Sequence, residues 1–307
     1  MERREFLKRS AAAAFAVGAS SALGNFSNLL ARNYISAKSS YDLVAVKGGE
    51  PEIMFDKAIA SLGGMNHFVK KGQTVVVKPN IGWDVSPERA GNTNPKLVER
   101  IIQHCFNSGA KNVYVFDHTC DNWTRCYSDS GIERVVKDSG GKIVSGESES
   151  YYQEVSFKGG KVMNTAKVHE LILSADVFIN VPILKHHSSS KITAAMKNLM
   201  GVVWDRGYWH QNNLHQCIAD FSLYRKPDLN IVDAYYVMKR NGPRGVSKDD
   251  LVLLKSQIIS TDIVAADSAA AKLFGVDPGD IPYIKLADEM KVGSKDLSKL
   301  KINRIIM

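Results

Sequence analysis

The sequence predicts an α/β fold, a mostly parallel sheet flanked by helices on both faces, with a small antiparallel hairpin inserted into it. Residues 113–116 and 177–184 are almost entirely apolar, as is typical of strands buried on both faces. Amphipathic helical segments alternate with such runs, and the clearest begins at Asn94, whose side chain can cap the helix before Pro95. Alternating strands and helices favour a mostly parallel sheet.

The other elements follow in order along the chain. Pro79 ends the second strand, and Asp262 caps an alanine-rich helix. Residues 155–163 form the expected hairpin, and residues 204–213 are expected to be an irregular loop. The pattern predicts strands at 41–46, 74–77, 113–116, 143, 177–184, 229–232, 258–259 and 302–306, and helices at 50–62, 95–106, 132–137, 168–173, 191–203, 215–224 and 262–274.

In residues 176–203 an apolar strand is followed directly by lysine, histidine and serine residues. The strand ends in Lys185, His186 and His187, so these side chains are expected at the carboxyl end of a sheet strand, where open α/β sheets bind ligands. Three serines follow and supply capping hydroxyls for a helix that carries Lys197. Because backbone N–H groups at a helix start attract anions, the stretch indicates a negatively charged ligand.

Three other predicted strands also end in polar side chains. Lys78 and Asn80 follow the second strand, Asp117 and His118 follow the third, and Asp233 follows the strand at 229–232. The carboxyl ends of parallel strands meet at one edge of a sheet. Their accumulation predicts a ligand site at that edge.

The composition is that of an ordinary globular protein with a mild positive charge. The chain has 307 residues, of which 44% are hydrophobic and 23% charged, and its formal net charge is +8. Residues 1–36 contribute +3 of this charge, so the remainder favours small anionic ligands. No stretch interleaves basic and aromatic residues as a nucleic-acid surface would, so no nucleic-acid partner is expected.

The N-terminus predicts export. Arg3 and Arg4 precede an apolar, small-residue run at 11–23, and the segment RREFLK resembles the twin-arginine export signal. The run is too short and too rich in small residues for a stable membrane span. We therefore expect a signal peptide and linker at 1–36, a single α/β domain at 37–307, the twin-arginine machinery as a partner, and a periplasmic or otherwise exported mature protein.

The cysteine spacing excludes the common cysteine-ligated cofactors. No C-x-x-C motif occurs among Cys105, Cys120, Cys126 and Cys217, so a zinc ribbon or a ferredoxin-type cluster is not expected. An oxidising compartment would permit a disulfide between Cys120 and Cys126.

Several separated motifs carry a family resemblance, in order along residues 41–307. They are VVVKPN, TNPKLVERIIQHCFNSGAKNVYVFD, ADVFINVPILKHH, KITAAMKNLMGVV, IVDAYYV, NGPRG and STDIVAAD. Together they resemble the family known as domain of unknown function 362. A remoter resemblance, to the cofactor-binding half of nickel-pincer lactate racemase, concerns the fold alone.

The resemblance implies a set of characteristic positions. Some relatives carry an added ferredoxin-like module, which this sequence lacks, so the resemblance implies no cysteine-ligated iron–sulfur cluster here. The positions that match the family are Lys78, Asn80, Lys185, His187, Thr193, Lys197, Asn198, Asp233, Asp262 and Asp267.

Three interpretations of function compete. The first is an enzyme that binds an anionic small molecule or organic cofactor. Histidine could serve it as an acid or base because imidazole titrates near neutral pH, and burial can shift the pKa of lysine into the same range. Its catalytic residues would be His187, Lys185 and His118, and its cofactor-binding residues Lys78, Asn80, Thr193, Lys197, Asn198 and Asp233.

The second interpretation is a transition-metal site assembled from His186, His187 and Asp117. The third is a non-catalytic accessory protein that binds a ligand or transfers electrons to a redox partner.

Overall fold

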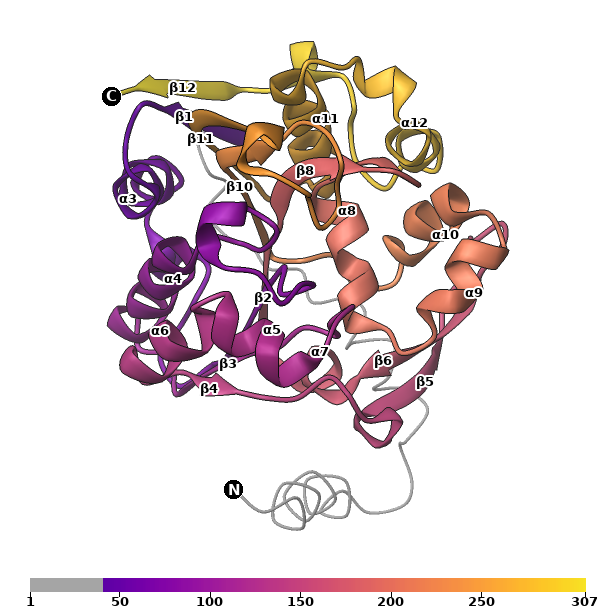
Figure 1. Cartoon of the computed structure of the whole chain (residues 1–307), viewed down its shortest axis with the longest axis horizontal. Coiled ribbons are helices and arrows are strands. Elements are labelled where there is room, and N and C mark those ends of the chain that lie inside the picture. Colours follow the sequence, from indigo (N-terminus) through magenta and orange to yellow (C-terminus); the bar gives the residue numbers. More distant parts are fainter. Residues whose placement is uncertain (1–40) are drawn as a thin grey trace, which may run out of the picture. The chain divides into compact units, whose positions relative to one another are not determined.

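A ten-stranded mixed sheet organises residues 41–307, the part of the chain that the computed structural model describes (Figure 1). The strand order is β12-β1-β11-β10-β7-β2-β3-β4, with β8 and β9 joined to the side of β10. Most neighbours are parallel, and the antiparallel pairs are β1 with β11, β10 with β11 and β8 with β9. The predicted α/β class is confirmed. The expectations for the export signal lie outside the described residues.

The sheet is built from strands of 2 to 10 residues, and a separate two-stranded antiparallel hairpin is formed by β5 and β6. The strands are β1 (Leu43–Lys47), β2 (Thr74–Pro79), β3 (Asn112–Val115), β4 (Lys142–Ile143), β5 (Tyr152–Ser156), β6 (Thr165–His169), β7 (Val177–Val181), β8 (Ile183–His187), β9 (Lys191–Thr193), β10 (Leu229–Met238), β11 (Leu251–Ser260) and β12 (Ile302–Ile306).

Helices cover both faces of the sheet, as Figure 1 shows. One face carries α3 (Pro51–Ser61), α4 (Pro95–Asn107), α5 (Trp123–Asp129) and α6 (Ile132–Asp138). The other carries α7 (Glu170–Ser174), α8 (Ala195–Asn198), α9 (Arg206–Gln211), α10 (Leu214–Phe221), α11 (Ile263–Phe274) and α12 (Pro282–Glu289).

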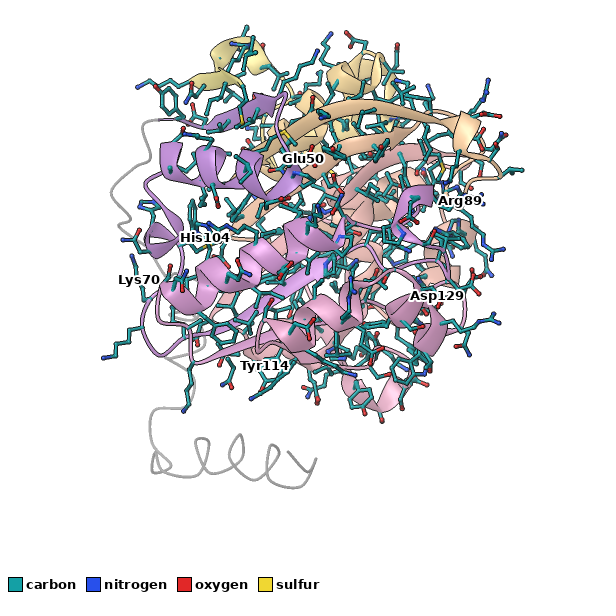
Figure 2. All side chains as sticks on the ribbon, turned by 60° about the vertical axis from the view of Figure 1, so that its left-hand side comes forward. Glu50, Lys70, Arg89, His104, Tyr114 and Asp129 are labelled. Carbon is teal, nitrogen blue, oxygen red and sulfur yellow. The ribbon has the colours of Figure 1, made fainter. Side chains whose placement is uncertain are left out.

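Strand alternation explains the two cores. In β2, Val75 and Val77 pack into the core under α3 and α4, whereas Val76 packs into the core under α8 and α11. Figure 2 looks onto the first of these helical layers, with His104 labelled on α4. The Nε2 atom of His104 lies 2.8 Å from Oδ1 of Asp56 on α3, so the two helices are also joined by a polar contact.

The same alternation places a polar row on the α8 face of the sheet. Lys78 on β2 lies beside Asn180 on β7, which lies beside Asn230 on β10, which in turn lies opposite Ser260 on β11. Asn180 and Asn230 are fully buried. Buried polar groups require hydrogen-bond partners. Asn180 finds two of its partners on α8, the Ala195 carbonyl and the Asn198 side chain.

The stretch 176–203 departs from its predicted form. Pro182 separates two strands, so Lys185, His186 and His187 lie within β8 instead of beyond its end. The three serines form the turn between β8 and β9 and do not cap a helix. The helix that follows, α8, has four residues, and its first N–H groups donate to the carboxylate of Asp267 on α11.

Other segments also differ from the prediction. Residues 204–213, expected to be a loop, contain α9, which Asp205 caps by accepting from the Tyr208 N–H. The hairpin is longer than the predicted 155–163, because its two strands pair residues 152–156 with residues 165–169. Asp233 lies in the middle of the ten-residue strand β10 and not at a strand end. Within residues 41–307, no helix combines the length and apolar character needed to cross a membrane.

Candidate functional site

A small cavity of about 60 Å³ lies where β2, β3 and β8 meet α8. A cavity of this size holds a few waters or one small anionic group, since a single water needs roughly 15 Å³. Its wall is polar and positively charged. It consists of Lys78, Asn80, Gly82, Trp83, Asp117, His118, Cys120, Lys185, His187, Thr193, Lys197, Asn198, Met200, Gly201, Arg206 and Pro243.

Lys78 and Asp117 form a buried ion pair at one side of the cavity. Lys78 Nζ lies 2.7 Å from Asp117 Oδ1 and donates to Asn198 Oδ1 at 3.0 Å. The second oxygen of Asp117 accepts from the Ile81 N–H at 2.7 Å. Burial lowers the pKa of Lys78, and the Asp117 carboxylate opposes that shift. The pair is therefore fixed in both position and hydrogen bonding.

Lys185 lies in the wall and has no carboxylate partner among residues 41–307. Its Nζ donates to Asn80 Oδ1 at 3.0 Å and to the carbonyl of Gly91. Only 1% of the residue is exposed, and this burial lowers its pKa to about 7. A lysine in this state can hold or release a proton near neutral pH.

A chain of amides, half-buried at Asn80 and buried from Asn198 onward, connects the two lysines to the sheet. Asn80 Nδ2 donates to Asn198 Oδ1 at 3.1 Å, and Asn198 Nδ2 donates to Asn180 Oδ1 at 2.9 Å. Asn180 Nδ2 then donates to Asn230 Oδ1 at 3.0 Å. Since each amide orientation is set by the next, Lys78 and Lys185 meet correctly placed acceptors.

Lys197 and Arg206 complete the positive wall. Lys197 is half-buried, and within residues 41–307 its ammonium makes no hydrogen bond or ion pair. Burial lowers its pKa to about 8. Arg206 donates to the carbonyls of His118 and Thr119 and has no carboxylate partner among the described residues. Against these cations the wall holds a single carboxylate, that of Asp117.

The two histidines of the wall hold opposite tautomers. His118 Nδ1 lies 3.0 Å from the Val203 carbonyl, which can only accept, so the proton is on Nδ1 and Nε2 keeps a free lone pair. His187 Nδ1 accepts from the Ser189 N–H at 3.1 Å, so its proton is on Nε2. Burial lowers the pKa of both, to about 2 for His187, and keeps both rings neutral.

The cavity can therefore hold an anion and exchange protons with it. Lys197 and Lys185 supply positive charge, His118 supplies a base, and His187 supplies a neutral N–H donor. The hydroxyl of Thr193, which lies opposite Lys185 in the β8–β9 pair, makes no hydrogen bond within the described residues. It is a further group available to a ligand.

A family model for a domain of unknown function, DUF362, matches residues 75–272. The chain belongs to the DUF362 family. The match includes every residue that lines the cavity of this DUF362 protein.

The individual proteins that this chain resembles share less than a third of its residues in the aligned part. The thylakoid-associated protein sll1697 of Synechocystis sp. is 28% identical over 75% of this chain and 71% of its own length. A solved protein from Thermotoga maritima aligns with a TM-score of 0.50 at 12% identity, over 74% of this chain and 60% of that one. The lactate racemase apoprotein from Thermoanaerobacterium thermosaccharolyticum aligns with a TM-score of 0.48 at 11% identity, over 78% of this chain and 57% of that one. This DUF362 protein thus spans under two thirds of both solved chains.

The DUF362 fold brings most of the sequence-predicted site residues together. The wall of the cavity includes Lys78, Asn80, Asp117, His118, Lys185, His187, Thr193, Lys197 and Asn198. Asp233 and His186 are not in this wall. The Asp233 carboxylate accepts from the Asn94 and Tyr235 N–H groups, and burial raises its pKa to about 6. Asp233 thus holds the start of α4 and does not face the cavity.

The predicted metal site is not assembled. His186 and His187 are neighbours on β8 and therefore point to opposite faces, and His186 Nδ1 accepts from the Gly242 N–H. Among residues 41–307 no group of three histidine, cysteine or acidic side chains is close enough to hold a metal ion. The four cysteines are free thiols in the DUF362 chain, and Cys120 lies in the cavity wall.

Three residues in or behind the cavity wall of the DUF362 chain were not predicted from its sequence. Arg206 lay in a segment expected to be a loop, with no pattern to mark it. Asn180 and Asn230 did carry a signal, because each is a lone amide inside an otherwise apolar strand. A buried amide requires a hydrogen-bond partner. Here Asn230 bonds to Asn180, and Asn180 bonds to Asn198 in the cavity wall.

Proposed function

We propose that this protein is an enzyme that binds a small organic anion in the cationic cavity and moves a proton on it. One observation carries the proposal: Lys78, Lys185, Lys197 and Arg206 line the cavity, and Asp117 is the only carboxylate among the residues that line it. Buried charges are costly unless paired, so an uncompensated group of cations favours an anionic ligand.

The residue roles follow from the hydrogen bonds. Lys197, which has no partner among the described residues, and Arg206 would bind the anion. His118 would take a proton through Nε2, and His187 would donate a hydrogen bond through Nε2–H to an oxygen of the substrate. Lys185, whose pKa is about 7, would return a proton to the substrate from its ammonium form, which leaves His118 protonated and Lys185 neutral until both exchange protons with water.

Titration calorimetry with inorganic phosphate and oxalate tests the binding step. The Lys197→Met variant keeps most of the unbranched side chain and removes the charge, so its affinity for both probes is expected to fall by about fivefold or more. The matched control is Lys111→Met, because Lys111 is an exposed lysine just before the amino end of β3, at the opposite edge of the sheet. Equal binding by all three proteins, or no binding by the wild type, would contradict the proposal.

Nitrogen-15 spectra of the histidine rings test the acid–base roles without any ligand. At about pH 7 we expect a neutral Nδ1–H tautomer for His118 and a neutral Nε2–H tautomer for His187. A charged imidazolium at either position would rule out the role given to that residue.

We also propose that the protein is exported through the twin-arginine pathway, a proposal supported by Arg3, Arg4 and the apolar run that follows them. Fractionation of cells that make the full chain is expected to place the mature protein in the periplasm. Replacing both arginines by lysine should retain it inside the cell, and unchanged export of that variant would overturn this part.

A further inference from the structure

A large groove opens next to the cationic cavity. The groove has a volume of about 840 Å³, whereas the cavity has about 60 Å³. His118 and Arg206 line both spaces, so the two meet at these residues. The cavity is large enough for only one anionic group, and the rest of an organic anion bound there would extend into the groove.

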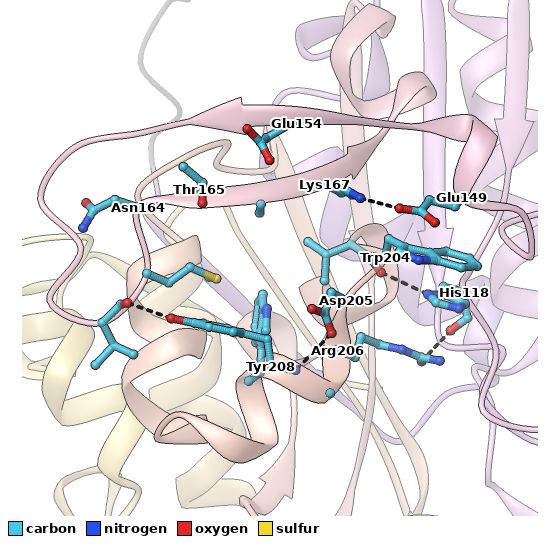
Figure 3. A pocket seen from close by; sticks show the side chains of 16 residues that line it. His118, Glu149, Glu154, Asn164, Thr165, Lys167, Trp204, Asp205, Arg206 and Tyr208 are labelled. Carbon is cyan, nitrogen blue, oxygen red and sulfur yellow. Dashed lines mark hydrogen bonds and ion pairs between the residues drawn. The ribbon is translucent and has the colours of Figure 1, made fainter.

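The groove runs between the β5–β6 hairpin and the segment 203–209, as Figure 3 shows. Tyr208 joins its two walls at one end, because its hydroxyl donates to the Val162 carbonyl at 3.2 Å. At the other end Trp204 stacks on His118, with ring centroids 5.0 Å apart and planes 3° apart. The groove therefore has defined ends, and one of them is the proposed base.

The groove, unlike the cavity, is lined by more carboxylates than cations: Glu149, Glu154 and Asp205 against Lys167 and Arg206. Glu149 forms an ion pair with Lys167, which leaves Glu154 and Asp205 as carboxylates without ion pairs among the described residues. Asp205 uses one oxygen to accept from the Tyr208 N–H. The Glu154 carboxylate makes no hydrogen bond within residues 41–307.

The groove also offers an unused hydroxyl. Thr165 lies on β6 in the groove wall, and its hydroxyl makes no hydrogen bond within the described residues. Together with Glu154 it can accept hydrogen bonds from donors on a ligand, and a carboxylate favours cationic or strongly donating groups.

We propose that the groove binds the body of the same ligand, and that this ligand has an anionic group at one end and hydroxyl or amino groups along the other. The inference rests on the proposed function, because the anionic end is placed in the cavity. It adds the substrate class: a polar, extended anion whose far end donates hydrogen bonds, not a simple carboxylate or an apolar acid.

Calorimetry with three graded probes tests this class. Inorganic phosphate offers the anionic end alone, glucose 6-phosphate adds hydroxyls, and glucosamine 6-phosphate adds an ammonium group. We expect affinity to rise in that order, and the Glu154→Gln variant to lose about fivefold for glucosamine 6-phosphate while binding inorganic phosphate as the wild type does. The matched control is Glu133→Gln on α6, outside the groove, which should leave all three affinities unchanged.

The outcomes separate the two proposals. Equal affinity of the wild type for the three probes, or an unchanged preference for the amino sugar in Glu154→Gln, would overturn the groove assignment. Phosphate binding that is lost in Lys197→Met would still support the cavity in that case. Failure of the wild type to bind any of the probes would overturn both.

Discussion

At Gly201 the backbone passes directly against the Lys78–Asp117 ion pair. A methyl group at this position would lie 1.8 Å from Asp117 Oδ1 and 2.6 Å from Lys78 Nζ, closer than any real contact. Both side chains are held by further hydrogen bonds and have no room to move away. The absence of a side chain at Gly201 is thus a requirement of the ion pair.

Gly201→Ala is therefore expected to displace the pair and to lower the free energy of unfolding by about 1–3 kcal/mol. Urea denaturation measures this change. Gly207→Ala is the control, because a methyl group there meets only Asp205 Oδ1 at 3.5 Å, an ordinary contact. If the two variants had the same free energy of unfolding, the close approach at Gly201 would not contribute to stability.

At the scale of elements, α8 depends on a neighbour. A helix of four residues is too short to be stable alone, and its first N–H groups, those of Ala195 and Met196, donate to Asp267 on α11. The helix carries Lys197 and Asn198 into the cavity wall. The position of two site residues is therefore set by a carboxylate of a distant segment.

Asp267→Asn replaces one acceptor oxygen by a donor that faces an N–H group. We expect a loss of about 1–3 kcal/mol in the free energy of unfolding, measured in urea, together with weaker phosphate binding. Asp249→Asn, at an exposed side chain, should change stability by less than about 0.5 kcal/mol. A variant as stable as the control, with full phosphate affinity, would show that α8 is held by other contacts.

The sequence predicted elements best where local signals were strong. The start of α4 at Asn94 and Pro95 was predicted correctly, because cap and proline are local features, and Asn94 does accept from the Lys96 N–H. The form of α8 was not predictable, because its capping residue, Asp267, lies 72 positions away from Ala195. The same holds for Arg206, which reaches the site through tertiary packing.

Among the site residues, too, local signals in the sequence identified some correctly, and tertiary packing decided the rest. Lys78, Lys185 and Lys197 could be chosen from the sequence, since strand ends and family motifs mark them. Asp233 was chosen for the same reason and lies elsewhere, because β10 continues past it and its carboxylate is used by backbone N–H groups. Sequence patterns identified the sheet edge, and packing decided which side chains face the cavity.

At the scale of the whole molecule, the site is a positive cavity joined to a groove in which carboxylates outnumber cations. The pKa of Lys185 is about 7 and that of Lys197 about 8, both lowered mainly by burial. Both ammonium groups are charged below about pH 7 and lose their protons as the pH rises through these values. Anion binding should follow the charged forms.

Sulfate affinity is therefore expected to fall by about tenfold or more between about pH 6 and pH 9, since sulfate remains a dianion throughout. Calorimetry over this range measures the change. Lys197→Met should leave a single step, that of Lys185, moved to higher pH because the repulsion from the Lys197 ammonium is lost, and Lys111→Met should retain the wild-type profile. A flat profile, or an affinity that rises with pH, would contradict the assignment.

Crystallography of the protein soaked in selenate tests the central claim most directly, because selenium is located by its anomalous scattering. The cationic wall predicts a selenate ion inside the cavity, within hydrogen-bond distance of Lys197 and Arg206. An occupied cavity in the wild type that becomes empty in Lys197→Met would support the anion site. An empty cavity in wild-type crystals whose surface lysines do bind selenate would contradict it.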